Sequence, residues 1–281
     1  MVMKNITFFL SFTILTLTTL AQKNDKTVKS LVNAEILLNE KANKETLQKA
    51  FLEFSDLSCI VFCPKPVSAK VYYNSNADLG KLSWKPEYAM ISKAGDFGFT
   101  TGPYIYNDFE KKTYGHYLSV WKADKNKKWK LVLNAKVSHL QPIKEFPEVF
   151  LNPDDYKYSK LIGPQKIQMR DDIVFNTDVL LGKSLQKFGN NSLNEFYDNS
   201  VRLYFPNHLP EFGKVAVLNF ITSQKINITS TPIATARAFS GDLAYTYGEA
   251  EINNKKYYYV RIWQIDAAMK WNIIIDAYMP S

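Results

Sequence analysis

The chain has 281 residues, of which 14% are aromatic and 46% hydrophobic, and this composition excludes an intrinsically disordered protein. The formal net charge is +8 at pH 7, but only four of the 35 basic residues are arginines. Because bidentate recognition of phosphates and bases relies on arginine more than on lysine, we expect no nucleic-acid partner and interpret the charge as an aid to solubility.

The chain begins with an apolar segment over residues 6–20, which is followed by the small residue Ala21. This segment is shorter than the roughly 20 residues that span a bilayer. The pattern predicts a signal peptide over 1–21 and a periplasmic or secreted protein without stable membrane insertion after cleavage. An uncleaved N-terminal anchor stays open as the alternative.

The next segment, residues 22–140, is predicted to form a first α+β domain. Apolar residues at amphipathic spacing indicate a first helix, and Leu47, Phe51 and Phe54 begin a second. The residues that define the first helix are Val28, Leu31, Val32, Ile36 and Leu37. Alternating runs separated by polar turns follow, ending with 117–122 and 129–133, and they predict an antiparallel meander after the helices.

The two cysteines, Cys59 and Cys63, lie in one β-prone run. Four residues of strand span about 13 Å, whereas a disulfide needs Cα atoms within about 7 Å. We therefore predict two free, mostly buried thiols. No Cys/His cluster has the spacing of a zinc site, so the sequence predicts no metal and no cofactor.

Residues 141–172 contain four prolines and many charges without a clear period, which is typical of a linker or an extended strap. A second domain is predicted over 173–281 because the chain repeats itself. Glu53, Phe54, Asp56, Ser58 and Pro64 recur, at a constant offset of 142, as Glu195, Phe196, Asp198, Ser200 and Pro206. The segment 94–102 recurs at an offset of 146, and Trp121, Trp129 and Asn134 return to 142, so the insertions cancel as expected for two copies of one fold.

The segments 84–86, 95–103, 114–121 and 129–134 together resemble bacterial nuclear transport factor 2-like proteins of the DUF4440 or SnoaL-like type. The resemblance covers most of the first copy and, more weakly, the second. It implies two tandem cone-shaped domains, each a bent antiparallel sheet wrapped around helices with a cavity at the wide end. Fold does not fix activity, and many members of this superfamily have no known function.

The resemblance also bears on ketosteroid isomerisation, which needs an aspartate base before a proline and a protonated aspartate on a later strand. The base position matches Cys63 and Phe205 in the two copies, and the second acid falls near Ser119 and Arg261. Neither copy has a carboxylate at either place. We therefore expect this chemistry to be absent.

Two functions from different classes remain open. The first is a binding module that holds a small hydrophobic molecule in a cone; the alternative is a lyase, isomerase or hydrolase acting in the first cone. The candidate cavity residues are aromatic or polar side chains near the expected cone mouths: Trp84, Phe99, Tyr104, His116, Trp121, Asn134, Tyr245, Trp263 and Asp276. The duplicated Asp96 and Asp242 are interpreted as turn residues that cap their own backbone. A homodimer that forms through the sheets is a separate expectation.

Overall fold

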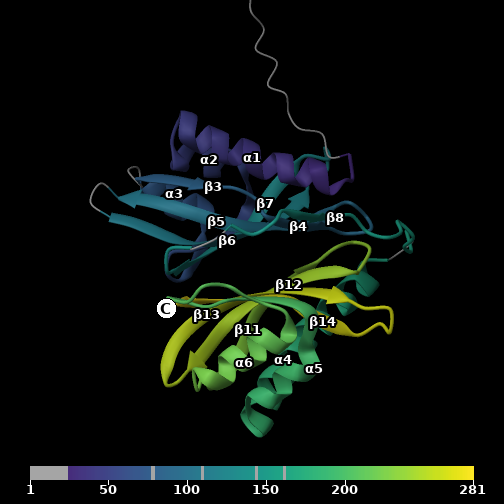
Figure 1. The fold of residues 1–281 in the computed structure, drawn as a ribbon. Helices are drawn as coiled ribbons and strands as arrows, with labels where there is room; N and C mark the ends of the chain where they lie inside the picture. Colours follow the sequence, from purple (N-terminus) through teal and green to yellow (C-terminus); the bar gives the residue numbers. More distant parts are fainter. Residues whose placement is uncertain (1–24, 77–79, 109–110, 143–144, 161–162) are drawn as a thin grey trace, which may run out of the picture.

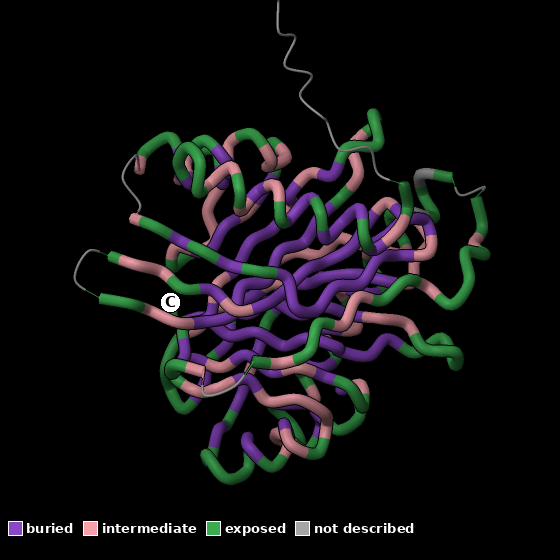
Figure 2. Tube along the Cα trace, turned by 45° about the horizontal axis from the view of Figure 1, so that its top comes forward, coloured by how far each residue is buried: buried purple, intermediate pink, exposed green. Residues whose placement is uncertain are grey.

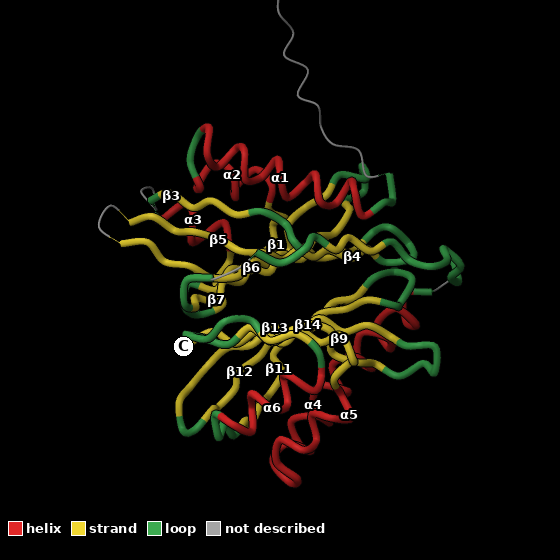
Figure 3. The backbone as a smooth tube through the Cα atoms, viewed as in Figure 1, coloured by secondary structure: helices red, strands yellow, loops and turns green. Residues whose placement is uncertain are grey.

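The computed structural model describes residues 25–76, 80–108, 111–142, 145–160 and 163–281. The predicted signal peptide, residues 1–21, lies outside this part of the chain. No helix in the described part is long and apolar enough to cross a membrane. Two halves are present, each consisting of a sheet with helices on one face (Figures 1 and 3).

The first half carries three helices and eight strands among the described residues. The helices are α1 (Val28–Lys44), α2 (Leu47–Phe54) and α3 (Ala69–Ser75). The strands are β1 (Ser55–Phe62), β2 (Pro66–Ser68), β3 (Lys81–Trp84), β4 (Tyr88–Ile91), β5 (Phe97–Asp108), β6 (Lys111–Ala123), β7 (Trp129–His139) and β8 (Val149–Leu151).

The second half carries six strands among the described residues. Its helices are α4 (Pro164–Phe188), the 3-10 helix η1 (Gly189–Ser192), α5 (Leu193–Phe196) and α6 (Lys214–Ser223). Its strands are β9 (Tyr197–Tyr204), β10 (Glu211–Phe212), β11 (Ile228–Arg237), β12 (Leu243–Ile252), β13 (Lys255–Ile265) and β14 (Trp271–Pro280).

The two sheets share one order of six strands, which confirms the predicted tandem α+β architecture, and the first sheet also contains β3, which pairs with β5, and β8 at its edge. Their strand orders are β2-β1-β7-β6-β5-β4-β8 and β10-β9-β14-β13-β12-β11. Irregularities recur as well: the register of β6 shifts between Val120 and Trp121, and that of β13 shifts between Ile262 and Trp263, the matching positions of the second copy. A shared bulge position is a feature of one fold used twice.

Helix α1 begins after Thr27, whose side chain accepts a hydrogen bond from the backbone of Ser30. Its buried stripe differs in part from the prediction, because Glu35 is buried whereas Ile36 is 37% exposed. Position 35, and not position 36, lies on the side of α1 that packs against the first sheet. The carboxylate of Glu35 therefore points into the core. This charged residue in a buried stripe has functional consequences that are described below.

The halves pack through their sheets, giving four layers in the order helices, sheet, sheet, helices (Figure 1). We call the face of each sheet toward its own helices the inner face, and the other the outer face. Buried apolar residues of both outer faces form one shared core, which includes Phe97, Val120, Val260 and Ile275. Figure 2 shows buried residues along the strands of both sheets. A homodimer through the sheets would need these outer faces, which already cover each other within one chain.

The duplicated Gly-Asp turns join the two halves reciprocally. Asp96 Oδ2 accepts a hydrogen bond from the backbone of Phe239 at 3.1 Å, and Asp242 Oδ2 accepts one from Lys93 at 2.9 Å. The two donors occupy matching positions of the two copies, as do the two acceptors, so the contact is self-complementary as in a two-fold dimer. The sequence predicts that these aspartates cap the backbone of their own turns, and the hydrogen bond that each accepts from the turn of the other copy is an additional role.

The segment 141–172 differs from a simple linker. Strand β8 pairs in parallel with β4 and extends the first sheet, and α4 begins at Pro164. Proline suits the first turn of a helix, where its missing N–H costs nothing. In the segment 141–172, Pro147 and Pro153 therefore flank the edge strand β8, and Pro164 marks the start of α4.

Both cysteines are free, as predicted. Cys59 is buried in β1, while Cys63 follows the strand and is partly exposed. Burial raises the pKa of the Cys59 thiol to about 12. The Cys59 thiol therefore lacks the lowered pKa that marks a reactive cysteine.

Candidate functional site

The space between the first sheet's inner face and its helices, which we call the first cone, is filled around Glu35. This carboxylate is 1% exposed and accepts hydrogen bonds from Trp84 Nε1 at 2.6 Å, Thr100 Oγ1 at 2.6 Å and Trp121 Nε1 at 2.8 Å. Burial raises the pKa of Glu35, against the opposing effect of these donors. The indole N–H groups of both tryptophans are therefore used internally.

The second cone is filled around Arg261, which is fully buried. Its guanidinium donates to Asp276 Oδ1 at 3.3 Å and to Asp178. Its Nη2 donates to the hydroxyl of Tyr278 at 3.2 Å, and its Cζ lies 4.1 Å from the centre of the Tyr259 ring. Asp178 lies on helix α4, and Glu35 lies on helix α1. In each copy, one acidic side chain of a helix is therefore buried in the core between that helix and its sheet.

Other predicted cavity residues in the cones are also engaged. Asn134 Nδ2 donates to Ser119 Oγ at 3.1 Å, although Asn134 Oδ1 is buried without a hydrogen-bond partner, and Trp263 Nε1 donates to Thr246 Oγ1 at 2.8 Å. A polar group that is satisfied inside a packed core has little capacity left for a ligand. The structure thus brings these candidates together in two cores and not around an open cavity.

Phe99 and Tyr245 do not face either cone. Both belong to the core between the two outer faces, where Phe99 lies 5.4 Å from Tyr88 and Tyr245 stacks on Phe97 at 6.2 Å between ring centres. Their assignment to a cone cavity is corrected, because side chains alternate between the faces of a strand and these positions point outward. The packing of one copy on the other was the missing information.

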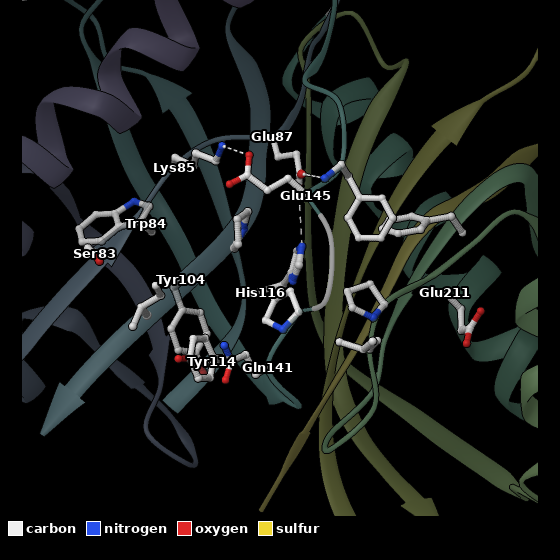
Figure 4. Close-up of a pocket in the computed structure, with 17 residues that line it drawn as sticks. Ser83, Trp84, Lys85, Glu87, Tyr104, Tyr114, His116, Gln141, Glu145 and Glu211 are labelled. Carbon is white, nitrogen blue, oxygen red and sulfur yellow. Dashed lines mark hydrogen bonds and ion pairs between the residues drawn. The ribbon is translucent and has the colours of Figure 1, made fainter. Parts of the chain in front are cut away.

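A pocket of about 820 Å³ lies where the two halves meet (Figure 4). The first half contributes residues from β3, β5, β6 and the segment after β7, and the second half contributes residues 209–212. Its aromatic lining consists of Trp84, Tyr104, Tyr114, Phe146 and Phe212, and its charged or ionisable lining of Lys85, Glu87, His116, Glu145 and Glu211. This volume lies within the usual range for small-molecule sites.

The most buried ionisable groups of this interdomain pocket form a chain. His116 Nδ1 lies 2.8 Å from His139 Nε2, and His139 Nδ1 lies 2.6 Å from the carbonyl oxygen of Leu140. On its other side, His116 Nε2 lies 3.5 Å from Glu87 Oε2, and it has no hydrogen-bond partner. Burial lowers the pKa of His116, although Glu87 acts in the opposite direction.

Neighbouring groups fix this chain in place. Glu87 and His116 are each 3% exposed, and Glu87 Oε1 accepts a hydrogen bond from the backbone of Phe146 at 3.0 Å. The ring of His116 stacks on Tyr204 of the second half, with 5.0 Å between ring centres. Residues of both copies therefore hold the imidazole.

Among the predicted site residues, the interdomain pocket brings together Trp84, Tyr104 and His116. Sequence reasoning missed Glu87 and Phe212, since nothing in the chain order places β10 beside β4. A signal was available for Glu87, because it follows Trp84-Lys85-Pro86, one of the segments that carry the family resemblance. In the described part of the chain, no group of three or more His, Cys, Asp or Glu residues could hold a metal ion.

No protein-family model matches this chain, and no curated protein matches it. Similar solved structures include an NTF2-like protein from Cytophaga hutchinsonii, with 15% identity over 43% of this chain and 100% of that chain, at a TM-score of 0.34. Nuclear transport factor 2 from Cryptosporidium parvum matches with 13% identity over 44% of this chain and 100% of that chain, at a TM-score of 0.33. A ketosteroid isomerase-like protein from Erwinia carotovora atroseptica matches with 13% identity over 40% and 91%, at a TM-score of 0.31.

Two of these three structures carry the name of nuclear transport factor 2, which the sequence resembles. Each covers about as much of this chain as one of its two halves. At such identities and TM-scores the similarity carries no argument about activity. The two-domain fold rests on the repeated topology described above.

Proposed function

We propose that this chain is an exported binding protein whose small-molecule site is the interdomain pocket. The observation that carries the proposal is the contrast between the cones and the pocket. Glu35 and Arg261, the ionisable groups at the centres of the two cones, are each bound to several polar partners in a packed core, whereas the pocket is an open volume that combines aromatic walls with a buried imidazole nitrogen that has no hydrogen-bond partner. Concave, mainly apolar sites with a few oriented polar groups are typical of ligand binding.

The alternative is a lyase, isomerase or hydrolase that acts inside the first cone. It has less support, because Glu35 accepts three hydrogen bonds there and is not free to take a substrate proton. A general base must come within hydrogen-bond reach of the proton that it removes. The packed core around Glu35 offers a substrate no such approach.

The test uses Nile red, a neutral apolar dye whose fluorescence rises in an apolar site. Ile105 lines the interdomain pocket and is 37% exposed, so Ile105→Trp should fill part of the pocket. The matched control is Ile233→Trp, at a 48% exposed position of β11 that does not line the pocket. We expect the wild type and the control to bind the dye and Ile105→Trp to bind it at least about tenfold more weakly. Equal binding by both variants would place the site elsewhere.

A further inference from the structure

The hydrogen atoms of His116, which lines the pocket, and of His139 behind it can be assigned from one end of their chain. A carbonyl oxygen can only accept, so His139 Nδ1 must donate to the oxygen of Leu140. In neutral His139, Nε2 is then an acceptor, and His116 Nδ1 must donate to it. Burial lowers the pKa of His116, so its ring is neutral at pH 7.5 and Nε2 is left with a lone pair.

That lone pair faces a second acceptor. Glu87 Oε2 lies 3.5 Å from His116 Nε2, and Glu87 Oε1 is occupied by the backbone of Phe146. Two acceptors that face each other in a buried site are unfavourable unless a donor lies between or beside them. The two acceptors therefore suit a ligand group that has at least two N–H bonds. Because one acceptor belongs to a carboxylate, a positively charged group suits them best.

We infer that the interdomain pocket recognises an organic ammonium ion, whose N–H groups donate to Glu87 Oε2 and His116 Nε2 while its aromatic or aliphatic body lies against the pocket's rings. This inference rests on the proposed function and names its ligand class. An ammonium group has three donors and no acceptor, so it can donate to His116 Nε2 and to Glu87 Oε2 together. Hydrogen bonds between ionised partners are the stronger ones.

The rest of the pocket agrees with a cationic ligand. Three carboxylates and one lysine line it: Glu87, Glu145, Glu211 and Lys85. Aromatic faces attract cations as well as apolar groups, and the rings of Trp84 and Tyr104 are among the lining. A nearby cation, Arg202, is held between the rings of Tyr88 and Phe212, 3.9 and 4.9 Å from their centres.

Three indoles of similar shape test the charge of the ligand by calorimetry on the wild-type protein at pH 7.5. They are tryptamine, the neutral 3-propylindole and the anionic indole-3-propionate. We expect tryptamine to bind at least about tenfold more tightly than either analogue. Equal or tighter binding of 3-propylindole would overturn the ammonium inference while the proposed function stands. Failure of all three indoles to bind would overturn the inference, and the Nile red result would then decide separately on the pocket itself.

Two variants test the position of the ammonium group. Glu87→Gln should remove most of the preference for tryptamine over 3-propylindole. Glu249→Gln is the control, since Glu249 is an exposed acid on β12 outside this pocket. A preference that survives Glu87→Gln would contradict the assignment. If that variant does not fold, the comparison of the three indoles on the wild type still tests the charge.

Discussion

Replacing Arg261 by methionine should destabilise the protein, because it removes the positive charge between the two buried acids of the second cone. The guanidinium is fully buried and binds both Asp178 and Asp276. Methionine replaces the unbranched stem of the arginine side chain without its charged guanidinium, so it leaves both carboxylates without a buried cation. Removing one partner from a buried ion pair costs more than the pair contributes, because the remaining charge is uncompensated.

The magnitude follows from what remains around the acids. Breaking a buried pair typically costs about 3–5 kcal/mol. Asp178 keeps the hydroxyl of Tyr259 at 2.8 Å, and Asp276 keeps those of Tyr197 at 2.8 Å and Tyr278 at 3.0 Å. These donors stabilise the anions in part, so we expect a loss of about 3 kcal/mol in the free energy of unfolding at pH 7.5.

The loss should depend on pH. Burial already raises the pKa of Asp276 above its ordinary 3.8, against the opposing effect of Arg261, so the variant raises it further. A folded-state pKa above the unfolded value means that protonation favours folding. The deficit should therefore be full above the raised pKa and shrink as pH falls through it toward 3.8.

Urea unfolding at pH 7.5 and at pH 5, followed by tryptophan fluorescence and circular dichroism, measures both effects. Ser119→Ala is the matched control, because Ser119 occupies the corresponding position of the first copy and accepts one hydrogen bond from Asn134. It should cost no more than about 1.5 kcal/mol at either pH. A loss below about 1 kcal/mol for Arg261→Met, or one that does not change with pH, would refute the account of the second cone.

Three further outcomes are expected. Asp96→Ala and Asp242→Ala should each lower the free energy of unfolding by about 1–3 kcal/mol. Because both residues hold the same pair of turns, a double-mutant cycle should give a non-zero coupling energy. Additive losses would contradict the reciprocal contact. Without reductant, iodoacetamide should alkylate Cys63 faster than Cys59 in the folded protein, since Cys59 is buried and its pKa is raised to about 12. After unfolding, intact mass should show that both cysteines are alkylated. If neither cysteine reacts in the unfolded chain, the two form a disulfide. The protein should not isomerise a Δ5-3-ketosteroid, because Cys63 and Phe205 stand where the base would be; turnover above the buffer rate would show that this alignment is wrong.

The internal repeat made most of the fold predictable. Offsets between matching residues require no knowledge of packing, and they predicted the two copies, while amphipathic and alternating spacing predicted the helices before the strands and the meander. The repeated Asp-x-Ser motif has a local cause that sequence reasoning could reach: Ser58 donates backbone and side-chain hydrogen bonds to Asp56, and Ser200 does the same to Asp198. Local chemistry of this kind survives duplication.

The packing of the copies on each other was harder to predict. Strand β14 is buried from Trp271 to Met279 without alternation, which is typical of a strand covered on both faces. The run Ile273-Ile274-Ile275 carries that signal in the sequence, but it does not say what covers the second face. Phe99 and Tyr245 were therefore placed in cones, although they belong to the core between the sheets.

The location of the proposed site follows from the reciprocal packing. A two-fold arrangement of two copies creates two equivalent junctions, and a second depression of about 550 Å³ lies at the other one. There the counterparts of Trp84 and Tyr104 in the second copy are Ser230 and Ala250, and the counterpart of His116 is Tyr258. The duplicated fold supplies both junctions, but the aromatic walls and the imidazole exist at one. Binding by the interdomain pocket therefore depends on residues in which the two copies differ, whereas the fold depends on those that they share.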